Sequence, residues 1–268
     1  MRVGWLPGVG GDRTHSDRDK PAKACESLPN VTGATGRMEI RGHNDLIGIG
    51  LYTPTEAGRL IDVKVPKLMR WLRGHQVRGN WYEPLWRPEV DLGDDKIYLS
   101  FRDLLEARVA SRFIEKGMSP QKIRLSITLA REVVGERPLS TAWLKTDGRT
   151  VFLKVLRDTG DEPELMNLFS KQYAFNAIVE QSLRDVEFDG PLPNIWWPLG
   201  KRSGILIDPQ RAFGQPIEQE TSIPAEVLAN AAKAEGSAEA AARAWDVPYS
   251  AVRRAIKFQQ HLGRKKAA

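Results

Sequence analysis

Positive side chains between residues 59 and 78 recur at a spacing that suits binding to a polyanion. Lys64, Lys67 and Arg70 are three residues apart, so on a helix they share one face, and Arg73 extends the row. The leucines between them turn to the opposite face. A row of cations neutralises DNA phosphates, which dominate affinity for duplex DNA. The predicted DNA-binding residues, including flanking cations on both sides, are Arg59, Lys64, Lys67, Arg70, Arg73 and Arg78.

A second group of cations lies near the C-terminus, at Arg253, Arg254 and Lys257. Two roles stay open for this group. One is a second contact to DNA. The other, which we favour, is a contact to an acidic site on a partner protein, because arginine pairs with carboxylates through two parallel hydrogen bonds.

Catalytic patterns are absent from the sequence. Asp91, Asp94, Asp95 and Asp103 form an acidic patch, but three of them fall in a predicted turn, and solvated charge explains the patch. The four histidines and the single Cys25 are too far apart for a usual zinc spacing, and no glycine-rich phosphate loop occurs. We therefore expect no enzymatic activity, no metal and no cofactor.

The composition restricts the class of protein. The 268 residues are 41% hydrophobic and carry a formal net charge of +6. Apolar runs are short and interrupted by charges, which excludes a transmembrane helix. A lone cysteine excludes an internal disulfide, so a reducing cytoplasm is expected. The charge is uneven: residues 38–80 carry +3, residues 151–220 carry −4 and residues 221–268 carry +4.

The cations of the first group require a helix-turn-helix to position them. Thr53, Pro54 and Glu56 form a capping box that starts a short helix, and Asp62-Val63 turns the chain. A second helix is predicted from Val65 to Arg73, closed by Gly74. The pattern of residues 75–100 then predicts short strands and turns, as in a wing.

Two longer helices are predicted after the wing, over Phe101–Lys116 and from Ser119-Pro120 to Val134. Aromatic side chains of the helix-turn-helix, the wing and the later chain are expected in the core or packed on the wing rather than on a nucleic acid. These are Trp71, Tyr82, Trp86, Trp196 and Trp197.

The middle of the chain is predicted to be mixed. Asp147-Gly148 with alternating Val151, Leu153 and Val155 indicates a hairpin over residues 141–156. A helical stretch is expected over Glu162–Phe188, and a strand over Gly204–Ile207.

Three short helices are predicted at the C-terminal end. Pro224 begins the first, Ser237 caps the second over Ala238–Trp245, and Tyr249–Leu262 forms the third. This is a second helix-turn-helix-like unit.

Two stretches resemble known families. Tyr52-Thr53-Pro54-Thr55-Glu56-Ala57 through Lys67-Leu68-Met69-Arg70-Trp71, with the wing and the helices after it, resembles the DNA-binding domain of MerR-type winged-helix proteins. Phe213-Gly214-Gln215-Pro216-Ile217, Thr221-Ser222-Ile223-Pro224 and the helix break at Gly236-Ser237 resemble a small domain of many short prokaryotic antitoxins. One departure is Glu220, where that small domain usually has glycine.

The joined arrangement is similar to the larger VapB-type antitoxins. The resemblance implies a type II toxin–antitoxin role, in which the chain neutralises a VapC-like PIN-fold ribonuclease toxin and binds its own double-stranded promoter DNA as a homodimeric autorepressor. It implies toxin contact for Arg253, Arg254 and Lys257. Two alternatives stay open: a stand-alone MerR-like transcriptional regulator without a toxin, and a nucleic-acid-processing enzyme.

The expected fold class is mostly α with small β elements (α+β), organised in consecutive parts. Residues 1–37 are a disordered tail or a mis-called extension ahead of Met38. The predicted parts after them are a winged helix-turn-helix domain (45–138), a mixed linking region (139–208), a three-helix antitoxin-type domain (209–262) and a basic tail (263–268).

Overall fold

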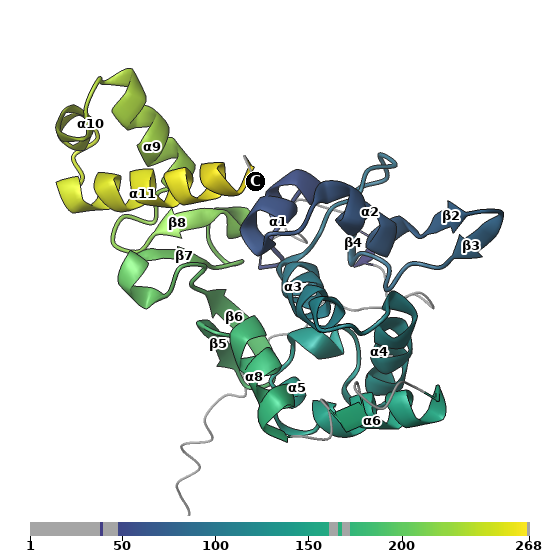
Figure 1. The fold of residues 1–268 in the computed structure, drawn as a ribbon. Helices are drawn as coiled ribbons and strands as arrows, with labels where there is room; N and C mark the ends of the chain where they lie inside the picture. Colours follow the sequence, from purple (N-terminus) through teal and green to yellow (C-terminus); the bar gives the residue numbers. More distant parts are fainter. Residues whose placement is uncertain (1–37, 40–47, 161–165, 168–171, 267–268) are drawn as a thin grey trace, which may run out of the picture. The chain divides into compact units, whose positions relative to one another are not determined.

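The computed structural model describes residues 38–39, 48–160, 166–167 and 172–266 (Figure 1). Helices dominate these residues and the sheets are small, so the predicted fold class, mostly α with small β elements, is confirmed. The predicted tail over residues 1–37 lies outside the described residues.

The first helical region forms as the sequence predicts. Helix α1 spans Pro54–Ile61 and α2 spans Val65–Arg73. The capping box at Thr53 is present, because its hydroxyl accepts from the Glu56 amide while the Glu56 carboxylate accepts from the Thr53 amide. Strands β2 (His75–Val77) and β3 (Asn80–Tyr82) then pair as an antiparallel hairpin, which is the predicted wing.

Two long helices follow the wing. A short strand β4 (Val90–Asp91) pairs with β1 (Met38–Glu39) before α3 (Phe101–Glu115) and α4 (Pro120–Val134). Eight apolar residues along these two helices are buried together. These residues are Phe101, Leu104, Leu105, Val109, Phe113, Ile123, Ile127 and Ala130.

The predicted hairpin over residues 141–156 is wrong. A short 3-10 turn, η2 (Pro138–Ser140), leads into two helices, α5 (Trp143–Thr146) and α6 (Gly148–Asp158). The alternation of apolar residues was misleading because Phe152, Val155 and Leu156 are three and four residues apart and are buried together on one helix face. Gly148 begins α6 rather than a hairpin turn, and a Cβ there would lie 2.6 Å from Leu144 Cδ1.

A four-stranded antiparallel sheet follows, and the sequence predicted one of its strands. The helix expected over Glu162–Phe188 is present as α8 (Gln172–Ser182), and Phe188 lies instead in strand β5 (Val186–Asp189). Asp185 adopts a left-handed conformation (φ 59°), which separates helix from strand. The other strands of the sheet are β6 (Leu192–Trp196), β7 (Ile205–Ile207) and β8 (Pro216–Glu218). The 3-10 turn η3 (Lys201–Ser203) lies between β6 and β7, and η4 (Ala212–Gly214) lies between β7 and β8.

The three C-terminal helices are α9 (Ala225–Ala234), α10 (Ala238–Ala244) and α11 (Tyr249–Lys266). Ser237 caps α10 as predicted, because its hydroxyl accepts from the Ala240 amide at 3.0 Å. Helix α11 continues to Lys266, so the predicted end of this helix at Leu262 is wrong. Residues 263–266, predicted as the start of a basic tail, belong to the helix. Gly263 lowers helix propensity by only about 1 kcal/mol and does not end the helix.

Tyr52 connects the first helical region to the antitoxin-like motif. Its hydroxyl donates to the Gly214 carbonyl at 2.7 Å, and the Leu51 amide donates to the Phe213 carbonyl at 3.0 Å. A Cβ on Gly214 would lie 2.5 Å from the Tyr52 hydroxyl, so this approach requires glycine. The first residue of the Gly-Gln-Pro-Ile motif is therefore needed for a tertiary contact.

The interpretation of Asp103 as solvated charge is wrong. This carboxylate is fully buried at the start of α3 and accepts from the Trp86 indole at 3.0 Å and from the Glu89 amide at 2.9 Å. It also forms an ion pair with the buried Arg137. Asp103 therefore joins the segment after the wing, the start of α3 and the segment after α4.

Glu106, one turn further along α3, makes the stability depend on pH. Burial raises the pKa of Glu106 to about 7 against the lowering effect of Arg137. The unfolded chain has an ordinary glutamate pKa near 4.3, so between these two values the folded state binds more protons. The free energy of unfolding should therefore fall as pH rises from about 4.5 to about 7, by on the order of 3 kcal/mol, and level off above pH 7.

Replacing Glu106 by glutamine should remove this dependence and stabilise the protein most at pH 8. The measurement is the free energy of unfolding in urea of the wild type and of Glu106→Gln at pH 5, 6, 7 and 8. Parallel pH profiles for the wild type and Glu106→Gln would contradict the assignment.

Candidate nucleic-acid interface

The turn between α1 and α2 depends on a glycine and a left-handed residue. Asp62 adopts φ 62°, and the Val63 amide donates to the Gly58 carbonyl at 2.9 Å. A Cβ on Gly58 would lie 2.6 Å from the Val63 carbonyl oxygen. Gly58 therefore permits the tight turn that orients α2, a role that the sequence analysis did not assign to it.

Helix α2 buries one face and exposes its cations on the other. Leu68, Trp71 and Leu72 are buried, which confirms the predicted core role of Trp71. The outward residues include all four predicted cations of this helix region, of which Lys67 alone is half-buried. These cations are Lys64, Lys67, Arg70 and Arg73.

Local contacts hold three of these four side chains in place. The Lys67 ammonium lies 5.2 Å from the centre of the Trp71 ring. The Arg70 Nε donates to the Pro66 carbonyl at 3.3 Å, and Arg73 donates to the Asp95 carbonyl at 2.8 Å. Because no carboxylate neutralises them in these contacts, their charge stays available to a polyanion.

The two flanking cations lie apart from this row. Arg59 lines a small cavity with residues of α1, β8, α9 and α11, among them Glu226 of α9 and Gln259 of α11. Arg78 occupies the tip of the wing, where Arg78 and Gly79 both have positive φ, 49° and 85°. Positive φ at both central residues is what a two-residue type I′ hairpin requires. Lys67 and Arg70 thus line one cavity beside α2, Arg73 lines another, Lys64 is the residue before the helix, and Arg78 lies on the wing.

Trp81 is a wing residue that the sequence analysis missed. It is 57% exposed and pairs with Gln76 across the hairpin. Its indole donates to Glu83 at 2.9 Å. The two-residue turn at Arg78-Gly79 could have predicted the position of Trp81 in the hairpin, because that turn sets the register of the two strands.

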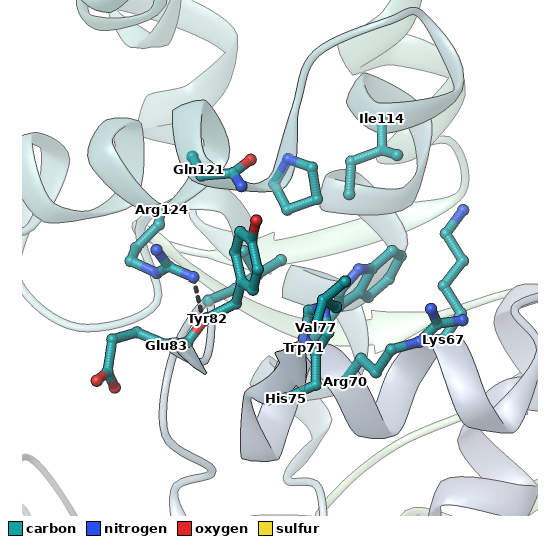
Figure 2. A pocket seen from close by; sticks show the side chains of 12 residues that line it. Lys67, Arg70, Trp71, His75, Val77, Tyr82, Glu83, Ile114, Gln121 and Arg124 are labelled. Atoms are coloured by element: carbon teal, nitrogen blue, oxygen red, sulfur yellow. Dashed lines mark hydrogen bonds between the residues drawn. The ribbon is translucent and has the colours of Figure 1, made fainter. Parts of the chain in front are cut away.

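A cavity of about 300 Å³ separates α2 from the wing and from the start of α4. Figure 2 shows Lys67 and Arg70 on one side of it and Arg124 on the other, with Trp71 and Tyr82 between them. Tyr82 stacks on His75 with ring centres 5.2 Å apart, and Arg124 donates to the Pro84 carbonyl at 2.8 Å. The hollow beside α2 is therefore apolar inside and cationic at its edges.

The structure separates the three predicted cations of α11. Arg253 and Lys257 are exposed, whereas the Arg254 side chain is 22% exposed. Arg254 forms an ion pair with the fully buried Glu218 at 2.7 Å and a second with Glu220 at 2.9 Å. The residue that departs from the usual antitoxin pattern is thus a partner of Arg254.

In the described part of the chain, no three histidine, cysteine or acidic side chains are grouped so that they could hold a metal ion. No described helix is long and apolar enough to span a membrane.

Residues 54–82 are two helices joined by a tight turn and followed by a β-hairpin, which is the order of elements in a winged helix-turn-helix unit. The search of family models found no match. The chain is 28% identical over 186 residues to a protein of Mycobacterium tuberculosis named "Putative antitoxin VapB45", covering 63% of this chain and 77% of that protein. It also resembles the crystal structure of Rv2018 from the same organism, with a TM-score of 0.56, 24% identity, and coverage of 78% of this chain and 98% of that one. That structural likeness concerns the fold alone.

Proposed function

We propose that this chain is a non-enzymatic antitoxin of a type II toxin–antitoxin system that also binds its own promoter. The similarity to the M. tuberculosis protein supports the antitoxin role. The MerR-like arrangement of α1, α2 and the wing supports promoter binding.

The observation that carries DNA binding is the cluster of four cations in and directly before α2, none of which is buried. Phosphate contacts fix the position and orientation of a protein on DNA, and side chains that reach base edges read the sequence. In this proposal Lys64, Lys67, Arg70 and Arg73 contact phosphates, and Arg78 contacts the backbone from the wing. A homodimer would present two such units to a two-fold operator.

The proposed toxin is a PIN-fold ribonuclease, whose acidic metal site attracts basic segments. Arg253, Arg254 and Lys257 were predicted to reach it. Arg254 is held within the chain by Glu218, which leaves Arg253 and Lys257 free. We therefore propose toxin binding for the chain as a whole and leave the toxin's docking face open.

Co-expression tests the antitoxin role. A PIN-type ribonuclease encoded beside this gene should arrest growth when expressed alone, and the full chain should restore growth and co-purify with the ribonuclease. Restored growth without a complex, or a complex without restored growth, would contradict neutralisation by direct binding.

The alternative function is a stand-alone MerR-like regulator, which the winged unit equally supports. It predicts tight promoter binding without any PIN-type partner. Promoter affinity together with failure to rescue growth would favour this alternative.

A further inference from the structure

The turn between α10 and α11 has the geometry of a helix-turn-helix. Asp246 adopts a left-handed conformation, φ 50°, directly after α10. The Val247 amide donates to the Ala242 carbonyl at 3.0 Å and the Asp246 amide to the Arg243 carbonyl at 3.4 Å. These are the two hydrogen bonds of a Schellman motif, which ends one helix and redirects the chain at once.

The two helices cross steeply after this turn. Figure 1 shows α10 end-on and α11 lengthwise. Their contact is a small core in which Ala241, Ala242 and Val252 are buried and Val247 packs against them. Small side chains let the helices approach closely, as in the helix pair of DNA-binding helix-turn-helix units.

The outer face of α11 is polar and cationic from its first turn onward. Five of its exposed residues lie along one side of the helix, the first two adjacent and the others three or four apart. They are Tyr249, Ser250, Arg253, Lys257 and Gln260. The Arg253 guanidinium lies 5.6 Å from the centre of the Tyr249 ring, which holds it near the start of the helix. The first turns of a second helix are the part that enters the major groove in helix-turn-helix proteins.

The sequence of α11 contains no carboxylate. Its 18 residues include six lysines or arginines and no aspartate or glutamate. Duplex DNA offers a phosphate along every few ångströms of its length, so a helix without acidic side chains can lie along it without like-charge repulsion. An 18-residue helix with six cations and no acid favours the extended polyanion.

Arg254 supports this face from behind. Its ion pairs with Glu218 and Glu220 tie α11 to strand β8 and the turn after it. This tie leaves Arg253 and Lys257 as the described free cations of α11 and fixes the direction in which they project.

We propose that α11 is a second DNA-reading helix of this chain, with duplex DNA as its partner. The assignment adds a DNA contact to the promoter binding proposed above. It does not depend on the antitoxin role, and it moves Arg253 and Lys257 from toxin contact to DNA contact.

The test is DNA binding by the full chain carrying Arg253→Ala and Lys257→Ala. The probes are the duplex upstream of its own coding sequence and a scrambled duplex, measured by fluorescence anisotropy at several salt concentrations. The dissociation constant should rise roughly ten-fold, and the slope of log affinity against log salt should shrink by about two, because two phosphate contacts are lost. The same two substitutions should weaken residual binding further in a chain that already carries Lys67→Ala and Arg70→Ala.

Three further variants distinguish contact from structure. Lys154→Ala with Arg157→Ala removes the same charge from one exposed face of α6, where the two residues are three rather than four apart, and should leave binding unchanged. Arg253→Lys should retain the salt slope. Arg254→Ala should lower the melting temperature, while Arg253→Ala with Lys257→Ala should not.

The proposal is overturned if Arg253→Ala with Lys257→Ala binds DNA like the wild type. Unchanged DNA binding together with lost capture of the co-expressed ribonuclease would assign this face to the toxin instead. Whether α2 binds DNA is a separate question, because only the variant with Lys67→Ala and Arg70→Ala tests that helix.

Discussion

A chain carrying Lys67→Ala and Arg70→Ala should bind its promoter DNA at least ten-fold more weakly than the wild type at physiological salt. The two side chains lie on the exposed face of α2, beside the cavity between α2 and the wing. For each phosphate contact that the variant loses, binding releases about one counterion fewer. The slope of log affinity against log salt should therefore shrink by about two. Anisotropy titrations between 50 and 200 mM salt measure both quantities.

The control for this experiment is charge-matched. Lys154 and Arg157 are exposed on α6 and are also three residues apart, so Lys154→Ala with Arg157→Ala changes the net charge equally. If both double variants weaken binding alike, the effect comes from net charge and α2 is not the DNA-binding helix. Folding should survive in both, because neither pair belongs to the core.

The largest effect on stability is expected from Arg137→Met. Arg137 and Asp103 form a buried ion pair, and Arg137 also donates to the Arg87 carbonyl at 2.6 Å. Removing the guanidinium leaves the Asp103 carboxylate buried without its cation, which costs on the order of 3–5 kcal/mol. Urea unfolding should show this loss as a lower midpoint.

A double-mutant cycle separates the pair from the loss of packing. Adding Asp103→Asn to Arg137→Met removes the uncompensated charge, so the double variant should be more stable than the sum of the two single losses predicts. Strict additivity of the two losses would show that the charges do not interact.

Local sequence signals predicted the helices that carry the proposed contacts. The helix caps at Thr53, Ser100 and Ser237 are hydrogen bonds between residues three apart in the sequence. They could therefore be recognised without knowledge of the fold. The cationic row on α2 follows from the helical period alone. For these elements the side chains close in sequence supply most of the information.

Only the tertiary structure decided which polar side chains are free. Asp103 and Arg254 look like surface charges in the sequence, yet partners 34 and 36 residues away hold them in ion pairs. Such pairing is set by how distant segments pack, and no short window contains it.

The same reason explains the errors in the middle of the chain. Asp147-Gly148 is a hairpin signal by local chemistry, but burial of Phe152 and Leu156 on one face favours a helix. By itself the sequence determined where most helices begin and where positive charge gathers. The packing of distant segments decided which of those charges stay exposed, because burial and ion pairing depend on contacts that form only in the folded chain.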